Sequence, residues 1–283
     1  MSTFEIQTKI DSAIRILKIA EKQAEVYDEP VEIAYSGGKD SDVLLQLAKE
    51  SGIKFIAIYK NTTIDPPGTI QHVRENNVKI QQPKLSFFDI IKKKGFPSMF
   101  RRFCCSELKE YKIYNVCALG VRAAESSKRK KMYKTFEECR VFSKKEKVKQ
   151  YYPIWDWTLS NVTNFIKSRN IKLAPVYYTD SGDIDFSRRL GCQGCPLKND
   201  RGAADFKKNI PLLKAWLRAG VNYTHTHTHT LAKFDGDAFK GFVCNVFFKS
   251  YEDFKTAISN NLFSENYDCK KYLENYFNTK FNF

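Results

Sequence analysis

The stretch E-I-A-Y-S-G-G-K-D-S-D-V-L-L (residues 32–45) joins two apolar runs through a short polar segment that contains two glycines. Residues 31–35 predict a buried strand, and residues 42–51 predict a helix that ends near Gly52. In a strand–loop–helix unit, the loop N–H groups and the helix N-terminus form a site for an anion. Gly37 and Gly38 allow the tight turn and the close approach of a phosphate that such a site needs.

The polar side chains of this loop suit the same ligand. Ser36 and Ser41 can donate hydroxyl hydrogen bonds, Lys39 can place a positive charge on phosphate, and Asp40 can hold Mg²⁺. The spacing excludes a Walker A loop. An ordinary strand-to-helix turn with an Asp or Ser cap is the alternative. The combination S-G-G-K-D-S between a strand and a helix favours a phosphate site.

Strand-like and helix-like segments alternate along the first 180 residues at intervals typical of βαβ crossovers. We therefore expect an α/β fold, with a Rossmann-like parallel sheet between helices over residues 1–205. Residues 206–283 are aromatic and less regular, and predict a C-terminal extension of unknown role. The other expected elements are helices at 4–27, 69–76, 87–95 and 159–170, strands at 54–60, near 77–80 and at 114–122, and a loop at 61–68.

Four of the eight cysteines form two motifs. R-R-F-C-C-S-E-L-K (101–109) contains Cys104 and Cys105, and R-R-L-G-C-Q-G-C-P-L (188–197) contains Cys192 and Cys195. The chain shows no secretory signal, so metal binding or redox chemistry is expected rather than disulfides. Four thiolates suit Zn²⁺ or an iron–sulfur cluster. Neighbouring side chains on a strand diverge, which favours a cluster over a single Zn²⁺. Buried structural cysteines with an accidental C-x-x-C are the alternative.

The segment G-V-R-A-A-E-S-S-K-R-K (120–130) follows an apolar strand, at the sheet edge where α/β proteins bind ligands. Arg122 and Arg129 could contact phosphate or sulfate, and Glu125 could orient a ribose or Arg122. The alternative is a helix surface on which Glu125 and Arg129 form an i,i+4 pair.

The net charge of +15 is compatible with a polyanionic partner such as nucleic acid. However, 35 Lys and only 12 Arg are spread along the chain, which is equally compatible with solubility alone. No apolar run is long enough to span a bilayer, so we expect a cytoplasmic protein without membrane contact. The run N-Y-T-H-T-H-T-H-T (222–230) could bind a metal as a strand, but a polar strand or loop is favoured.

The loop S-G-G-K-D-S resembles the PP-loop of the ATP pyrophosphatase superfamily, which has an adenine nucleotide alpha hydrolase-like fold. G-x-R-x-x-E-S-x-x-R (120–129) and P-I-x-D-W-T (153–158) resemble segments of phosphoadenylyl-sulfate (PAPS) reductase relatives and of DNA-phosphorothioation sulfurtransferases. The resemblance implies that ATP binds with Mg²⁺ and is cleaved to AMP and pyrophosphate, with Lys39, Asp40 and Arg122 as catalytic residues. The implied nucleotide-binding residues are Ser36, Gly37, Gly38, Lys39, Asp40, Ser41, Arg122, Glu125 and Arg129.

The cysteine spacing, with 86 residues between Cys105 and Cys192, resembles that of assimilatory adenylyl-sulfate reductases. This resemblance implies a 4Fe–4S cluster on Cys104, Cys105, Cys192 and Cys195. Those reductases also use a nucleophilic C-terminal cysteine in a Glu-Cys-Gly-Leu-His context, and neither Cys244 nor Cys269 has that context. Cys244 lies in an apolar, strand-like run and is expected to be buried and inert. The missing context and the retained Lys and Asp of the loop favour ATP over a sulfonucleotide.

Three functions follow as hypotheses. The first is an enzyme that cleaves ATP to activate a substrate for sulfur transfer, with nucleic acid as a candidate acceptor and a sulfur donor or reductant protein as partner. The second is an adenylyl- or phosphoadenylyl-sulfate reductase that makes sulfite with a thioredoxin-type reductant and uses Cys269 as nucleophile. The third is a non-catalytic module that binds a nucleotide and nucleic acid.

Overall fold

The computed structural model describes residues 3–141, 147–226, 236–259 and 268–283, which form two compact units. Unit 1 comprises residues 1–61, 65–82 and 110–191, and unit 2 comprises residues 62–64, 83–109 and 192–283. Each unit has its own apolar core. The sequence predicted a domain over residues 1–205 and an extension over residues 206–283, and this division stays a prediction. The two compact units are defined differently, because each combines segments that alternate along the chain.

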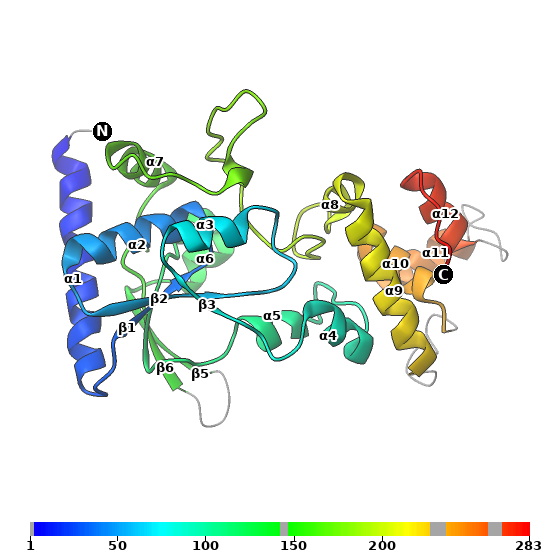
Figure 1. Ribbon diagram of the computed structural model, residues 1–283, viewed down its shortest axis with the longest axis horizontal. Coiled ribbons are helices and arrows are strands. Elements are labelled where there is room, and N and C mark those ends of the chain that lie inside the picture. Colours follow the sequence, from blue (N-terminus) through cyan, green and yellow to red (C-terminus); the bar gives the residue numbers. More distant parts are fainter. Residues whose placement is uncertain (1–2, 142–146, 227–235, 260–267) are drawn as a thin grey trace. The chain divides into compact units, whose positions relative to one another are not determined.

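Unit 1 is built on a six-stranded sheet with the order β3-β2-β1-β4-β6-β5. Only β5 runs antiparallel to its neighbour, and the remaining pairs are parallel (Figure 1). The predicted α/β fold with a Rossmann-like sheet is therefore confirmed. The strands are β1 (Val31–Tyr35), β2 (Phe55–Lys60), β3 (Lys79–Gln81), β4 (Val116–Leu119), β5 (Glu137–Val141) and β6 (Lys147–Tyr151).

Helices flank this sheet and bury its apolar side chains. α1 (Thr3–Glu25) contacts β1, β4 and β6, and α2 (Lys39–Ser51) contacts β1. Both helices also pack on α7 (Leu159–Ser168), which begins at a capping box between Thr158 and Asn161. These helices pack on the sheet and on each other through apolar stripes. In α1 the stripe includes Ala13, Leu17 and Ala20, which are fully buried. The shorter helices are α3 (Thr69–Glu75), α6 (Ser127–Met132) and the 3-10 turns Ala123–Glu125 and Pro175–Tyr177.

The strand order reverses between β1 and β4. From β1 the chain builds outward through β2 and β3, and then returns to the other side of β1 with β4. In open α/β sheets, ligands bind beyond the carboxyl ends of the strands at such a switch point. The segments that leave these two ends are the loop after Tyr35 and the segment after Leu119. The topology thus brings together two motifs that are about 80 residues apart in the sequence.

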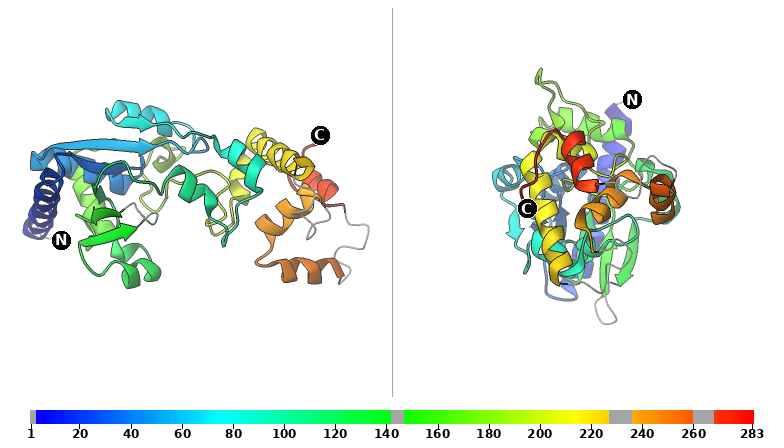
Figure 2. Two further views of the ribbon diagram at one scale, coloured as in Figure 1. Left: turned by 90° about the horizontal axis from the view of Figure 1, so that it is seen from below. Right: turned by 90° about the vertical axis from the view of Figure 1, so that its right-hand side faces the viewer.

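Unit 2 is helical in its described part. α9 packs against α4, α8 and α10, and α10 also packs against α12 (Figure 2). Trp216 of α9 lies at the centre of the core, with ring contacts to Phe87, Phe96 and Phe206. The helices are α4 (Phe87–Lys94), α5 (Phe103–Leu108), α8 (Ala203–Lys208), α9 (Ile210–Thr226), α10 (Ala238–Phe247), α11 (Tyr251–Ser259) and α12 (Cys269–Tyr276).

Several local expectations differ from this structure. Cys104 and Cys105 lie on helix α5 and not on a strand, and Cys244 lies on helix α10, although it is buried as expected. The extension after residue 205, expected to be less regular, is mostly helical in its described residues because its aromatic side chains pack together at helical spacing. The first part of the Thr-His run continues α9 to Thr226, and residues 227–230 lie outside the described residues.

No helix among the described residues is long and apolar enough to cross a membrane.

Candidate functional site: the loop of unit 1 and the cysteine pocket of unit 2

The segment Ser36–Ser41 comprises the connection from β1 and the first residues of α2, and it is closed by its own serines. The Ser41 hydroxyl donates to the carbonyl oxygen of Gly38 over 2.7 Å, and it accepts from the Ser36 N–H over 3.2 Å. Gly37 has φ of 74°, which a residue with a Cβ rarely adopts. These bonds hold the loop as a tight turn directly before the N-terminus of α2, where backbone N–H groups can serve an anion.

Gly120, at the end of β4, lets this segment approach the loop. A Cβ on Gly120 would lie 2.7 Å from the carbonyl oxygen of Asp40 and 3.2 Å from the amide nitrogen of Ser41. Contacts with backbone atoms at these distances cannot be relieved by turning a side chain. The glycine that opens the 120–130 motif is therefore needed for the packing of β4 against the loop, a role that the sequence analysis did not assign.

Lys39 is 4% exposed, and it forms no ion pair with any carboxylate of the described residues. Its Nζ donates to the carbonyl oxygen of Arg188 over 3.3 Å and lies 5.4 Å from the ring centre of Tyr177. Burial lowers the pKa of Lys39. The Tyr177 hydroxyl also accepts from the Lys39 N–H over 3.0 Å. A buried ammonium group without a carboxylate partner is costly, and a bound anion would compensate for that cost.

Asp40 and Arg122 form a buried ion pair across the switch point. Arg122 Nε lies 2.6 Å from Asp40 Oδ1, and Arg122 Nη2 lies 3.4 Å from Asp40 Oδ2. The Arg122 side chain is 4% exposed and the Asp40 side chain 16%. The sequence suggested Asp40 as a ligand of Mg²⁺ and Arg122 as a contact to phosphate, and the structure shows that the two side chains bind each other. Both carboxylate oxygens accept from the guanidinium, so Mg²⁺ bound by Asp40 would share this carboxylate with Arg122.

Glu125 gathers two further arginines in the same unit. It pairs with Arg129 four residues along the chain, which confirms the i,i+4 pair weighed from the sequence. It also lies 3.6 Å from Arg189 Nη1, and Arg189 Nη2 donates to the Glu125 carbonyl oxygen over 3.0 Å. Glu125 therefore holds Arg129 and Arg189 in position.

A buried polar network, which no local sequence pattern predicted, joins the elements around the loop. Asp42 is buried on α2, where its Oδ1 accepts from the Tyr35 hydroxyl and lies 3.0 Å from His72 Nε2. Burial raises the pKa of Asp42. Asp42 Oδ2 and His72 Nδ1 are buried without a hydrogen-bond partner among the described residues. The network ties together β1, α2 and α3, the three elements that frame the loop.

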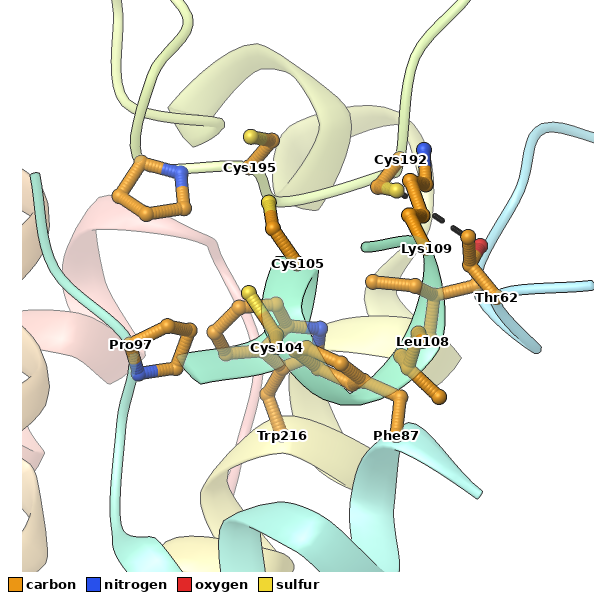
Figure 3. A pocket seen from close by; sticks show the side chains of 12 residues that line it. Thr62, Phe87, Pro97, Cys104, Cys105, Leu108, Lys109, Cys192, Cys195 and Trp216 are labelled. Carbon is orange, nitrogen blue, oxygen red and sulfur yellow. Dashed lines mark hydrogen bonds between the residues drawn. The ribbon is translucent and has the colours of Figure 1, made fainter. Parts of the chain in front are cut away.

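The four motif cysteines line one pocket of unit 2. Figure 3 shows Cys104 and Cys105 projecting from α5 toward the loop that carries Cys192 and Cys195. The pocket walls are otherwise mainly apolar, and Trp216 is one of them. At Gly194, which has φ of 71°, a Cβ would lie 2.5 Å from the Phe206 ring. The glycine inside C-x-x-C therefore lets that turn pack directly on the core.

The pKa values of the two adjacent thiols are shifted in opposite directions. The pKa of Cys105 is lowered to about 6, first because the Cys104 thiol donates a hydrogen bond to it. Arg102 contributes as well, since its Nη2 lies 3.7 Å from the Cys105 sulfur. The same hydrogen bond raises the pKa of Cys104. Cys192 donates to the Thr62 hydroxyl over 3.6 Å. The lowered pKa favours the thiolate form of Cys105, which is the form that binds metals.

The pocket brings together four soft sulfur ligands, which are the donors that Zn²⁺ and iron–sulfur clusters take. No group of three or more Cys, His, Asp or Glu side chains within the described residues is arranged as a closed set of metal ligands. The donor chemistry fits a cluster or Zn²⁺, and the thiols would have to turn inward to bind either. The other cysteines are separate from this pocket: Cys117, Cys244 and Cys269 are buried, and Cys139 is exposed.

The contacts missed from the sequence are those between distant segments. Tyr177, Arg188 and Arg189 reach the loop region from a segment that precedes C-x-x-C. Only the arginine pair in R-R-L-G-C gave a signal, because two adjacent arginines flank the motif. Tyr177 and His72 gave none, because an isolated tyrosine or histidine in a sequence most often serves packing.

The chain is similar to several solved structures. A PAPS reductase from Candida auris, solved as a phosphate complex, is 18% identical, with a TM-score of 0.43, and the match covers 65% of this chain and 95% of that one. A Candida glabrata FMN adenylyltransferase is 15% identical, with a TM-score of 0.44, and the match covers 61% of this chain and 58% of that one. A second structure of that enzyme, with FMN and the ATP analogue AMPCPP, gives 15% identity, a TM-score of 0.41, and coverages of 64% and 62%. A search of curated proteins found no match.

The profile of the phosphoadenosine phosphosulfate reductase domain matches residues 30–198. The match begins just before β1 and ends after Cys195, so it includes the loop, the 120–130 motif and all four motif cysteines. Because the match covers more than half of the sequence, the chain belongs to the phosphoadenosine phosphosulfate reductase domain family, whose members are nucleotide-binding enzymes of the PP-loop superfamily.

Proposed function

We propose that this enzyme binds ATP with Mg²⁺ on the loop of unit 1 and cleaves it to AMP and pyrophosphate in order to activate an acceptor for sulfur transfer. The observation that carries the proposal is the buried Lys39 ammonium group, which has no carboxylate partner among the described residues and stands at the N-terminus of α2. A polyphosphate would supply the missing negative charge. A single terminal sulfate would supply less of it.

The expected roles of the other residues follow from their contacts. Ser36, Gly37, Gly38 and Ser41 shape the loop so that the N-terminus of α2 faces the β- and γ-phosphates. Arg122, oriented by Asp40, stabilises charge that develops on the phosphates. Mg²⁺ enters with the nucleotide, since Mg²⁺ is commonly held by phosphates and only one or two carboxylates. Arg129 and Arg189, held by Glu125, extend the positive wall of the site.

The proposed reaction has two steps. An oxygen of the acceptor attacks the α-phosphorus of ATP, so that an O–P bond forms, the bond from the α-phosphorus to the bridging oxygen breaks, and pyrophosphate leaves. Sulfur at the sulfide level, from a donor protein or free sulfide, then displaces AMP, which departs with the acceptor oxygen. Neither step changes an oxidation state, and a persulfide donor would additionally require a thiol reductant.

The four pocket cysteines are the proposed ligands of a 4Fe–4S cluster. Cys105 would bind as a preformed thiolate, and the glycine-containing turn would present Cys192 and Cys195. A cluster bound there would supply either a place for sulfide or a path for electrons. Cys104 and Cys105 are successive residues of one helix, so their side chains leave the axis about 100° apart, which suits separate iron atoms better than one tetrahedral Zn²⁺.

The reductase alternative receives less support from the structure. It requires a nucleophilic thiolate, and Cys269 is 1% exposed at the start of α12. Burial raises the pKa of Cys269 to about 12, so its thiolate is scarce at neutral pH. Cys244 is also buried. Burial of both thiols disfavours either of them as a nucleophile.

The products of ATP cleavage test the proposed function. Anaerobic incubation with ATP, Mg²⁺, sulfide and single-stranded oligonucleotide is expected to yield AMP and pyrophosphate in equal amounts, measured by ion-exchange chromatography. Formation of ADP and phosphate would contradict the proposal, as would sulfite production from phosphoadenylyl sulfate with thioredoxin in place of ATP cleavage.

Metal analysis tests the role of the cysteine pocket. Protein purified without oxygen is expected to contain about four iron and four sulfide per chain, and Cys105→Ser is expected to lose most of both. Cys139→Ser is the matched control, because Cys139 is exposed on β5. About one zinc per chain, lost in Cys105→Ser, would instead identify a zinc site.

A further inference from the structure

A second pocket of unit 2, with a volume of about 390 Å³, lies between the α4–α5 connection and the corner that joins α10 to α11. Its volume is in the range of pockets that enclose a small organic group. Three cationic residues line it, Arg101, Arg201 and Lys249, and none of its lining residues within the described part of the chain carries a carboxylate. The aromatic residues that line it are Phe96, Phe100, Phe248 and Tyr251.

Most of these aromatic rings are held firmly by the core. Phe248 packs edge-on against Phe254, which also contacts Tyr251 and is itself buried. Phe96 stacks on Trp216. Phe100 differs, because it is 86% exposed in the connection between α4 and α5. An exposed phenylalanine beside a pocket of fixed rings offers a flat apolar face to a ligand from solvent.

The charges around the pocket favour an anionic ligand. Arg101 is anchored by a 3.0 Å bond from its Nη2 to the carbonyl oxygen of Lys94, which keeps its guanidinium at the pocket. Lys249 is exposed directly after α10. The nearby carboxylate of Asp253 is engaged in capping α11, where it accepts from the Ser250 N–H over 3.1 Å. The segment 83–109, which includes the α4–α5 connection, contains seven Lys or Arg and two Asp or Glu.

We propose that this pocket binds single-stranded nucleic acid, with an unpaired base on the aromatic residues and the flanking phosphates on Arg101, Arg201 and Lys249. Aromatic faces interleaved with cations are how proteins hold single strands without reading their sequence. A duplex would not suit the pocket, because its bases are already stacked on each other. An acidic polypeptide would use the cations but would leave the aromatic faces unused.

The second pocket lies next to the cysteine pocket. The segment 96–101 contributes to both pockets of unit 2: Pro97 lines the cysteine pocket, and Phe96 and residues 98–101 line the second pocket. A strand held in the second pocket therefore lies next to the four cysteines. This assignment rests on the proposed function, for which it names the acceptor as a single-stranded nucleic acid.

The test uses the full chain without ATP, so that binding is measured apart from catalysis. A fluorescein-labelled oligo-dT of 20 nucleotides is titrated with protein, and binding is followed by fluorescence anisotropy at several salt concentrations. We expect tight binding at low salt that weakens steeply as salt rises, and weaker competition by a duplex of equal length. Polyglutamate of matched charge should compete poorly. Equal competition by polyglutamate would overturn the proposal, as would the absence of binding.

Two variants locate the surface. Phe100→Ala should weaken binding about 5- to 100-fold, since stacking of a base on an aromatic ring is lost. Lys249→Ala should reduce the slope of log affinity against log salt by about 0.7, the value for one phosphate contact with a single strand. The matched controls are Met132→Ala and Lys22→Ala, which change an exposed apolar and a basic residue of unit 1. Binding that Phe100→Ala and Lys249→Ala leave at the level of the controls would overturn the proposal.

Failure of this proposal can be told apart from failure of the proposed function. If the oligonucleotide binds as expected but ATP yields no pyrophosphate, the surface stands and the reaction is wrong. If pyrophosphate is released but Phe100→Ala does not weaken binding, the reaction stands and the surface is wrong. Phe100→Ala is expected to keep the helical circular dichroism and the melting temperature of the unaltered protein, because the Phe100 side chain is 86% exposed in unit 2.

Discussion

Lys39→Ala is expected to lower the rate of pyrophosphate release by about 100- to 1000-fold, the typical loss when one preorganised group that stabilises transition-state charge is removed. Lys39 is buried at the N-terminus of α2, and its Nζ is held by the Arg188 carbonyl oxygen and the Tyr177 ring. An ammonium group fixed in this way is already in place when charge develops on the leaving pyrophosphate. The measurement is steady-state release of pyrophosphate from ATP and Mg²⁺ in a coupled assay.

Lys49→Ala is the matched control for this prediction. Lys49 lies in the last turn of the same helix and is exposed, so its loss should leave the rate within about twofold of the unaltered protein. Circular dichroism should show that Lys39→Ala keeps its helix content, because removing a buried unpaired charge does not by itself weaken the fold. Pyrophosphate release by Lys39→Ala at the rate of the control would remove Lys39 from the reaction.

His72→Ala is expected to reduce the free energy of unfolding of unit 1 by about 3–5 kcal/mol, as removal of one partner from a buried polar pair usually does. Asp42 is buried on α2 and depends on His72 and on the Tyr35 hydroxyl for its contacts. Without the imidazole, the carboxyl group would be buried with one partner fewer and a cavity beside it. Native-state hydrogen exchange of the β1 amides measures the loss, because it reports on the opening of unit 1 alone.

A double-mutant cycle identifies the cause of this loss. The variant with both Asp42→Ala and His72→Ala should be less destabilised than the sum of the single variants by about 1–3 kcal/mol, because the second change removes the group that the first left without a partner. The exposed pair of Arg169 and Glu50, which are 2.9 Å apart, is the matched control and should give a coupling of about 1 kcal/mol or less. Simple additivity for Asp42 and His72 would show that the network is not coupled.

The elements around the loop could be predicted from the sequence because their signals are local. The apolar run before Ser36 and the glycine pair after it fix a strand, a turn and a helix within about 20 residues. The expected parallel sheet follows from the same alternation, and the structure confirms it. The pairing of Asp40 with Arg122 could not be predicted, since it depends on which strand returns beside β1. The sequence identified both residues but could not bring them into contact.

The helices of unit 2 were harder to predict from the sequence, because many of the apolar residues that form their core are aromatic. Phe206, Trp216 and Phe242 are spread over three helices and meet in one core. Large aromatic residues are common in strands as well as in helices, so the pattern after residue 205 gave no clear period. Short helices such as α5 are set by packing more than by local preference, and for this reason the sequence did not predict the helix that carries Cys104 and Cys105.

The cysteine motifs show which features of a site a sequence motif can predict and which it cannot. The sequence identified four residues, and the structure places all four around one pocket of unit 2. The sequence could not show that Arg102 and Cys104 together favour the thiolate of Cys105, because this effect depends on how the side chains are oriented on α5. The identity of a bound metal depends on the same geometry, and the expected 4Fe–4S cluster remains a prediction for metal analysis.

Calorimetric binding of ATP–Mg²⁺ and of phosphoadenylyl sulfate, in parallel, to protein purified without oxygen tests the central claim most directly. The claim is that the loop of Ser36–Ser41, with Lys39 buried beside it, is built for the β- and γ-phosphates of ATP. It predicts that ATP–Mg²⁺ binds at least about tenfold more tightly, a difference of about 1.4 kcal/mol, and that Lys39→Ala abolishes this preference. Tighter binding of phosphoadenylyl sulfate would contradict the claim and identify the loop as a site for a terminal sulfate.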